Sequence, residues 1–302
     1  MYKKCIICDS LPDELVLNNL PMKKCRQCGL IWRKSFDMPI QHYAEKDRDL
    51  SQGKQERRLS NCKDRAKTFR KYINLNNLCD VGCGEGMFLK VLQDFGYKNV
   101  MGIEPSNSDK YAEFAKENRL NVQKGTIKDV GSVINRHNIR TITMFHVIEH
   151  LENPLESLKI VYGNLTPGSC IVIETPNMAA YSLRKSNYKH DYLIYPEHFF
   201  YFNESNLKTL LEKIGFNIIA RGKRDFNPKS NLNIRESLFR LGLLRKNIHT
   251  KDYKSTIKGD DLDSFWSKNL LIGKIKGIIR FILTKIVIIL GRQDIMWIIA
   301  KK

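Results

Sequence analysis

The sequence predicts an α/β protein built on a doubly wound, mostly parallel sheet, and three features of the chain indicate it. Short apolar runs alternate with segments of helical periodicity over residues 73–225, the pattern of a parallel sheet covered by helices. The apolar run that ends at Val81 leads into a turn rich in glycine, between Gly82 and Gly86. An acidic residue, Glu104, ends the next apolar run, 18 residues past Gly86.

The charge of the chain is concentrated in its two flanks. The net charge is +19: residues 1–72 carry 17 basic and 9 acidic side chains, residues 73–220 carry 15 and 16, and residues 221–302 carry 19 and 7. Such flanks favour an anionic partner, either nucleic acid or acidic phospholipid, or they are a solvated lysine-rich exterior. The first residues, MYKKCIICDS, contain no apolar segment of a secretory signal, and the eight cysteines then favour reduced thiols. We therefore expect a cytoplasmic protein.

Four cysteines near the amino terminus have the spacing of a metal site. Cys5 and Cys8 form one C-x-x-C pair, and Cys25 and Cys28 form a second pair after 16 intervening residues. Each pair can form a turn whose two sulfurs point at one ion. Four thiolates fill a tetrahedral Zn²⁺ shell and leave no position for water, which predicts a structural metal. Residues 1–35 are therefore predicted to be a zinc ribbon.

The chain after the ribbon is divided by composition into four further parts. Residues 36–72 are polar and charged, and we expect a linker followed by a helix from about Gln55 to Tyr72. Residues 73–225 form the predicted core. Residues 226–293 are predicted to be a basic and apolar helical insertion, and residues 294–302 the last strand of the core.

The glycine turn and Glu104 together predict a cofactor that contains a nucleoside. Glycines leave backbone N–H groups accessible at the carboxyl end of the strand. An acid at the end of the next strand is placed to accept hydrogen bonds from both hydroxyls of a ribose. The full stretch from Asp80 to Gly86, DVGCGEG, begins with an acid.

This stretch resembles motif I of the class I S-adenosylmethionine (SAM) methyltransferases, of the methyltransferase domain 23 type. The resemblance continues through HVIEHLENP, LTPGS and IETPN and covers about residues 70–225. It implies a Rossmann-like sheet of seven strands, completed by Phe216–Ile219 and Ile295–Ala300, with the helix before the first strand covering the cofactor. It also implies SAM as the cofactor, with Asp80 facing the cationic methionine part. The other expected cofactor-binding residues are Gly82, Gly84, Gly86, Glu104, Thr126, Phe145 and His146.

Two stretches contain candidate catalytic residues. The first is His146 to His150, HVIEH, which resembles the E-x-x-E-H of ubiquinone-biosynthesis O-methyltransferases, where a divalent metal is bound. Here His146 replaces the first acid, so Mg²⁺ at Glu149 and His150 is an open expectation, and the alternative is that both residues shape the loop through hydrogen bonds. The second stretch contains His198, which similar sugar methyltransferases place near the acceptor, where it could act as a base. A structural His198 packed among aromatic residues is the alternative.

The insertion contains an apolar segment, Asn269 to Arg292, that holds several lysines and arginines. Basic residues at the centre of a spanning helix are costly, so a helix lying at an anionic membrane surface fits better, with a buried helix or a dimer contact as alternatives. The leading functional expectation is SAM-dependent methyl transfer to a sugar or small-molecule hydroxyl, in surface-glycan or lipid-linked saccharide assembly at the inner membrane face. The alternatives are a quinone-type O-methyltransferase, an RNA methyltransferase that uses the basic flanks, and a non-catalytic SAM-binding module.

Overall fold

The computed structural model describes residues 2–17, 20–35, 52–179, 197–224, 278–279, 281–283, 285–286 and 293–302. The chain divides into two compact units, which are Met1–Pro176 with His190–Gly222 and Met296–Lys302, and Asn177–Lys189 with Lys223–Ile295. All the predicted site residues belong to the first unit. The linker predicted after residue 35 and most of the predicted insertion lie outside the described residues.

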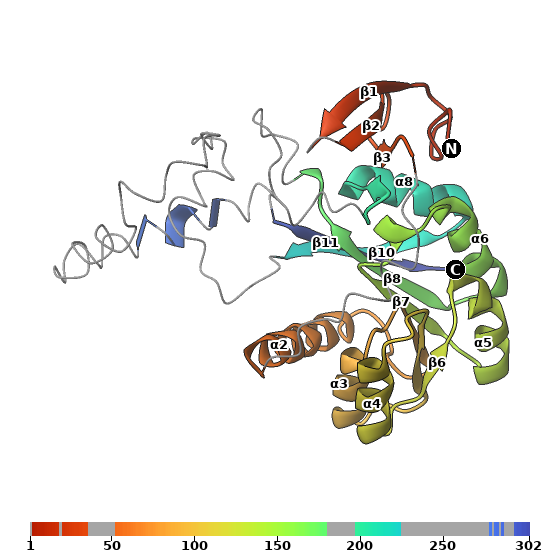
Figure 1. The fold of residues 1–302 in the computed structure, drawn as a ribbon, viewed down its shortest axis with the longest axis vertical. Helices are drawn as coiled ribbons and strands as arrows, with labels where there is room; N and C mark the ends of the chain where they lie inside the picture. The colour runs from red at the N-terminus through yellow and green to blue at the C-terminus, as the bar shows by residue number, and fades with distance from the viewer. Residues whose placement is uncertain are drawn as a thin grey trace. The chain divides into compact units, whose positions relative to one another are not determined.

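The core of the first unit is a sheet of seven strands in the order β10-β11-β8-β7-β4-β5-β6, which confirms the predicted fold class (Figure 1). β4 pairs in parallel with both β5 and β7, and the outer pairs β5 with β6 and β7 with β8 are parallel too. The chain therefore reverses its direction of progress across the sheet between β4 and β7, where ligands of such sheets bind. The strands are β4 (Leu78–Val81), β5 (Val100–Glu104), β6 (Val122–Lys124), β7 (Thr141–Phe145), β8 (Cys170–Pro176), β10 (Asn217–Arg224) and β11 (Ile295–Lys301).

Helices cover both faces of this sheet because its central strands β4, β7 and β8 are buried on both sides. On one face lie α2 (Gln52–Phe69), α3 (Met87–Asp94) and α4 (Asp109–Glu117), and on the other lie α5 (Val130–His137), α6 (Pro154–Asn164) and α8 (Glu204–Ile214) (Figure 1). β4 shows the alternation: Leu78 packs in the cluster that contains α2 and α3, whereas Cys79 and Val81 pack in the cluster of α5, α6 and α8. Side chains of β4 that point the same way as Leu78, including Asp80, therefore face α2 and α3.

Local capping explains where several helices begin. Asn153 caps α6 as its pattern predicts, with the Glu156 amide donating to the Asn153 side chain at 3.2 Å. α3 begins at Met87 with Gly86 in the cap position, and α4 begins at Asp109 with Ser108 in the cap position.

A second sheet contains the amino-terminal ribbon. It has four antiparallel strands in the order β1-β2-β3-β9, namely β1 (Pro12–Leu17), β2 (Leu20–Cys25), β3 (Ile31–Arg33) and β9 (Phe200–Tyr201). The sequence did not predict β9, which has only two residues and comes from a distant part of the chain. The ribbon is thus joined to the core by strand pairing as well as by the chain itself.

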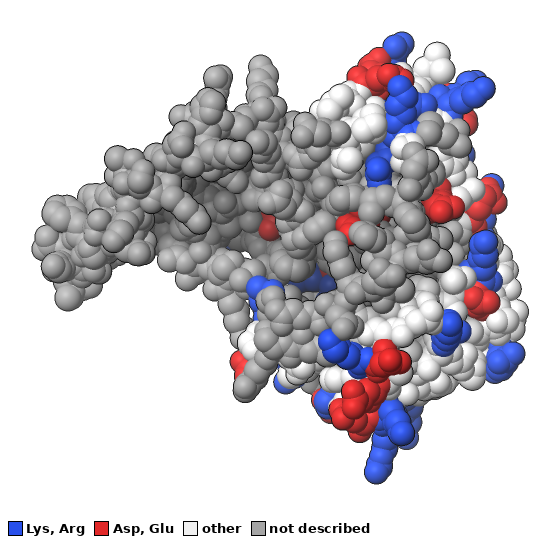
Figure 2. Space-filling view, in the orientation of Figure 1, with Lys and Arg blue, Asp and Glu red and all other residues white. Residues whose placement is uncertain are grey.

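Charged side chains of both signs are interspersed over the described part of the face in Figure 2. This distribution agrees with the near-neutral balance of residues 73–220. Among the described residues, no helix combines the length and the apolar character needed to cross a bilayer.

Candidate functional site

The turn after β4 needs glycine at its first and last glycine positions. Gly82 and Gly86 have φ angles of +70° and +88°, in the left-handed region that other residues rarely adopt. A Cβ atom at Gly82 would lie 2.6 Å from a methyl of Val147, and one at Gly86 would lie 2.8 Å from a methyl of Leu120. The turn therefore packs closely on Val147 in the loop after β7 and on Leu120 in the segment before β6.

Asp80 is buried beneath this turn. Its carboxylate accepts a hydrogen bond of 2.6 Å from the Thr143 hydroxyl, its direct neighbour on β7. Burial raises the pKa of Asp80 to about 7, although the Thr143 hydroxyl and Arg65 act in the opposite direction. At a pH near 7 such a carboxyl group is therefore only partly ionised. A cationic ligand beside it would favour its charged form.

Glu104 lies at the carboxyl end of β5, beside the same turn. One carboxylate oxygen accepts the backbone N–H of Gly84 at 2.7 Å, and the other accepts the N–H of Ser106 at 3.0 Å. These two bonds fix the orientation of the carboxylate. Each oxygen has a further lone pair, so the group can still accept hydrogen bonds from a ligand with two adjacent hydroxyls.

Two arginines of α2 were not predicted as site residues, yet both hold this helix at the site. Arg65 donates to Glu174 at the end of β8, through Nη2 at 2.5 Å and Nε at 3.1 Å. Its guanidinium also lies 4.4 Å from the centre of the Phe145 ring. Arg58 pairs with Glu85 in the glycine turn. The two arginines are seven residues apart, which places them on one face of a helix; that spacing was the available signal.

His146, which is partly exposed, pairs with the buried Glu149 in the loop after β7. The Nδ1 atom of His146 lies 3.2 Å from Glu149, and the Thr175 hydroxyl donates to the other Glu149 oxygen at 2.8 Å. Burial acts to raise the pKa of Glu149, but the hydrogen bond from His146 and the nearby charges of His146, His150 and His198 together outweigh it and lower this pKa to about 2. Burial likewise acts to lower the pKa of His146, and its hydrogen bonds to Glu149 and Glu174 raise it instead.

The structure brings the three predicted catalytic residues together. The rings of His150 and His198 meet edge to face with their centres 4.6 Å apart. Potential ligand atoms of Glu149, His150 and His198 all lie within 4.8 Å of one another. His150 contacts the Glu197 carbonyl oxygen through Nδ1 at 2.9 Å.

These side chains do not favour the Mg²⁺ considered from the sequence. Mg²⁺ prefers an octahedral shell of oxygens, whereas two of the three groups here offer ring nitrogens. His146, which stands in place of the acid of the resembling motif, is engaged with Glu149. The cluster therefore does not match the oxygen shell that Mg²⁺ prefers.

Thr126 and Phe145 have local roles in the structure. Thr126 caps the short 3-10 helix η1 (Ile127–Asp129): its hydroxyl accepts the Lys128 amide, and its own N–H donates to Asp129 at 2.7 Å. The Phe145 ring stacks on Phe69, with ring centres 5.8 Å apart. Contact of either residue with a cofactor stays a prediction.

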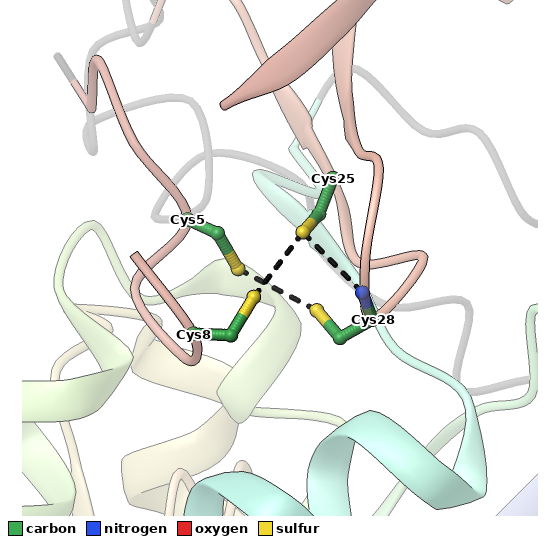
Figure 3. A group of neighbouring side chains, drawn as sticks. All are labelled: Cys5, Cys8, Cys25 and Cys28. Atoms are coloured by element: carbon green, nitrogen blue, oxygen red, sulfur yellow. Dashed lines mark hydrogen bonds between the residues drawn. The ribbon is translucent and has the colours of Figure 1, made fainter. Parts of the chain in front are cut away.

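The four cysteines of the amino-terminal ribbon converge on one point (Figure 3). The Sγ atoms of Cys5 and Cys28 lie 3.5 Å apart, and those of Cys8 and Cys25 lie 3.4 Å apart. A tetrahedral Zn²⁺ with bonds of about 2.3 Å separates its sulfurs by about 3.8 Å, so the arrangement fits this ion. The Cys5 and Cys28 thiols share a hydrogen bond, which lowers the pKa of Cys5 to about 5 and raises the pKa of Cys28.

Comparisons with known proteins agree with this geometry. A family model described as "Methyltransferase domain" matches residues 51–221, more than half of the chain. The chain is 25% identical over 135 residues to the mitochondrial ubiquinone biosynthesis O-methyltransferase of Dictyostelium discoideum, covering 38% of this chain and 42% of that protein. It is 26% identical over 166 residues to protein arginine N-methyltransferase 1 of Chlamydomonas reinhardtii, covering 49% and 47%. The chain thus spans less than half the length of these relatives.

Among solved structures, a SAM dependent methyltransferase from Archaeoglobus fulgidus shares the fold with a TM-score of 0.53 and 22% identity, over 83% of this chain and 98% of that one. This likeness concerns the fold alone, and the family match concerns the sequence of the core. Together they confirm the resemblance that the DVGCGEG turn predicted. The chain belongs to the methyltransferase domain family, with the fold of the class I SAM-dependent methyltransferases.

Proposed function

We propose that this protein transfers the methyl group of SAM to a hydroxyl group of a small molecule or sugar. The observation that carries the proposal is the pair of carboxylates at the ends of β4 and β5. Asp80 is buried beneath the glycine turn, and Glu104 is fixed beside it by the N–H of Gly84. An anion suits the cationic part of SAM, and a fixed carboxylate suits the two hydroxyls of its ribose.

Each residue then has a defined task in the reaction. SAM, when bound, supplies an electrophilic methyl group and its own leaving group, so the protein mainly has to align the acceptor and exclude water. Gly82, Gly84 and Gly86 let the ligand approach the backbone. His198, beside His150, accepts the proton that an acceptor hydroxyl loses as it is methylated.

The proposed acceptor belongs to surface-glycan or lipid-linked saccharide assembly. Support comes from the apolar and basic segment Asn269 to Arg292, in which the described side chains of Ile278, Phe281 and Ile282 are half or more exposed. Exposed apolar side chains among basic ones suit an anionic membrane surface, and a lipid-linked acceptor would be found there.

Two other acceptors have specific support. The relative from Dictyostelium discoideum is a ubiquinone biosynthesis O-methyltransferase, which favours a phenolic acceptor of the quinone type. The basic flanks favour an RNA acceptor. An RNA acceptor predicts that RNA binding weakens steeply as the salt concentration rises. Incubation of the purified protein with methyl-labelled SAM and cellular fractions of glycan, lipid and RNA distinguishes the three. Label in none of the fractions would leave only a SAM-binding module.

SAM binding itself is tested by calorimetry on Glu104→Gln. Loss of a charge-assisted hydrogen bond to the ribose costs about 1.5–3 kcal/mol, which weakens SAM binding by roughly 10- to 100-fold. Glu117→Gln, on the exposed surface of α4, is the matched control and should bind SAM like the unmodified protein. Equal SAM affinity in the two variants would remove the main support for the proposed function.

The four-cysteine site is proposed to hold a structural Zn²⁺ through Cys5, Cys8, Cys25 and Cys28. All four sulfurs are needed to fill a tetrahedral shell, so no position remains for a reacting water. Metal analysis of the purified protein should give about one zinc per chain, and substitution of Cys8 by serine should lower it.

A further inference from the structure

The ribbon is hydrogen-bonded to the chain segment that contains His198. β3 pairs with β9, so that Ile31 is opposite Tyr201 and Trp32 is opposite Phe200. β9 begins two residues after His198. The N–H of Arg33, at the end of β3, donates to the carbonyl oxygen of Phe199 at 2.9 Å.

The opposite side of the same segment is bonded to the loop after β7. The N–H of Phe199 donates to the carbonyl oxygen of Glu149 at 2.8 Å. Phe199 therefore accepts a hydrogen bond from the ribbon through its carbonyl oxygen. Its N–H donates a second hydrogen bond to the loop that contains Glu149 and His150. His198 directly precedes Phe199 in the chain, so these two bonds fix the backbone next to it.

Side-chain packing joins the same parts. Trp32 of the ribbon and Phe199, Phe200 and Phe202 of the segment are buried together with Cys5 and Cys25 in one apolar cluster. The Lys213 ammonium of α8 donates to the carbonyl oxygens of Ile6 and Ile7, in the turn between Cys5 and Cys8. A ribbon of this size has little core of its own, so its order depends on the metal and on this contact.

On the cofactor side, the strand pairing that the structure describes stays within the core sheet. Asp80 and Glu104 belong to β4 and β5, whose strand partners are β6 and β7 and one another. Loss of order in the ribbon would therefore reach the His198 segment first and leave the glycine turn in place.

We propose that the zinc ribbon is a positioning device for the acceptor side of the site: metal bound by the four cysteines orders β3, and β3 holds the segment 197–202 so that His198 meets His150. This inference rests on the proposed function for the role of His198, but not for the coupling itself. It makes the metal necessary for the geometry of the acceptor side without any contact between metal and substrate.

The test follows amide hydrogen exchange in the full-length protein, with zinc bound and after removal of zinc by a chelator. Exchange within residues 197–202 should become at least about tenfold faster without zinc, because its bonds to β3 open, while exchange in β4 stays unchanged. Calorimetry should give the same SAM affinity within about twofold in both forms. Unchanged exchange in 197–202 after the ribbon amides have lost protection would overturn the proposal, as would loss of SAM binding in step with zinc.

A matched pair of proline variants keeps the test decisive if the chelated protein unfolds. Arg33→Pro removes the N–H that bonds to Phe199 but leaves all four cysteines, so zinc content should persist while 197–202 exchanges faster. Lys34→Pro removes an N–H that bonds to Pro21 within the ribbon, and 197–202 should stay protected. Equal exchange of this segment in both variants contradicts the coupling. Failure of the zinc-loaded protein to bind SAM would count against the proposed function instead, since the exchange measurement needs no ligand.

Discussion

Asp80 shows how one buried side chain can make ligand binding depend on pH. Its pKa is raised to about 7 by burial, whereas binding of a cation needs the ionised carboxylate. We expect SAM affinity to fall about tenfold per pH unit below about pH 7, because binding must then remove a proton. Calorimetry between pH 5.5 and 7.5 measures the slope. A flat profile would show that Asp80 does not pair with the cationic part of SAM.

The Asp80→Asn variant tests the same point through folding. The carboxyl group of the ligand-free protein keeps its proton up to about pH 7, but the unfolded chain loses it near 3.9. Stability is therefore lost as pH rises between these values. Asparagine does not ionise, so the stability of Asp80→Asn relative to the unmodified protein should be greater at pH 8 than at pH 5 in urea unfolding.

His198 should affect turnover without affecting cofactor affinity. It lies against His150 on the acceptor side and is buried, and a positioned base accelerates proton transfer by about 10²- to 10⁴-fold. We expect His198→Ala to lower kcat by about this factor with the methyl acceptor found by labelling, while the Kd for SAM changes less than about twofold. His137→Ala, on α5, is the control. A parallel loss of SAM binding would assign His198 a structural role instead.

At the scale of elements, α2 is fixed to the sheet by buried charge pairs. Glu174 is fully buried and the Arg65 side chain is only 14% exposed, so removal of one partner leaves the other charge without compensation. We expect Arg65→Met to lower the free energy of unfolding by about 3–5 kcal/mol. Denaturation in urea measures this, and the double variant with Glu174→Gln should recover part of the loss because both charges are then absent.

An exposed pair serves as the control for this prediction. Lys90 and Asp94 lie four residues apart on α3, with Nζ of Lys90 3.0 Å from Oδ2 of Asp94, and their side chains are 33% and 49% exposed. Lys90→Met should change the free energy of unfolding by less than about 0.5 kcal/mol. If Arg65→Met were no more destabilising than Lys90→Met, the α2 contact would not be a structural constraint on the site.

At the scale of the whole molecule, the proposed membrane contact is tested by flotation. Full-length protein should float with vesicles that contain phosphatidylglycerol but not with phosphatidylcholine alone, and a variant without residues 264–292 should float with neither. Replacing Lys274, Lys276 and Lys285 by glutamine should weaken binding by about 1 kcal/mol per lysine. Binding that is equal for neutral and anionic vesicles would show that the basic residues are not used.

Local spacing was sufficient to predict the glycine turn and the strand ends that carry Asp80 and Glu104. The run from Asp80 to Gly86 and the distance to Glu104 specify a turn and two strand ends within 25 residues. Arg58 and Arg65 were missed because their partners, Glu85 and Glu174, lie 27 and 109 residues away. An exposed helix with the same sequence would carry the same arginines without any such contact.

The sequence by itself determined the glycine turn, the two carboxylates, the four-cysteine site and the alternation of strands and helices, because each depends on residues close together in the chain. Only the tertiary structure decided that β9 joins the ribbon sheet and that Glu149 meets His198. The physical reason is that these contacts depend on which distant segments pack together. Backbone bonds from Arg33 and Glu149 meet at Phe199 only once the core and the ribbon have both folded.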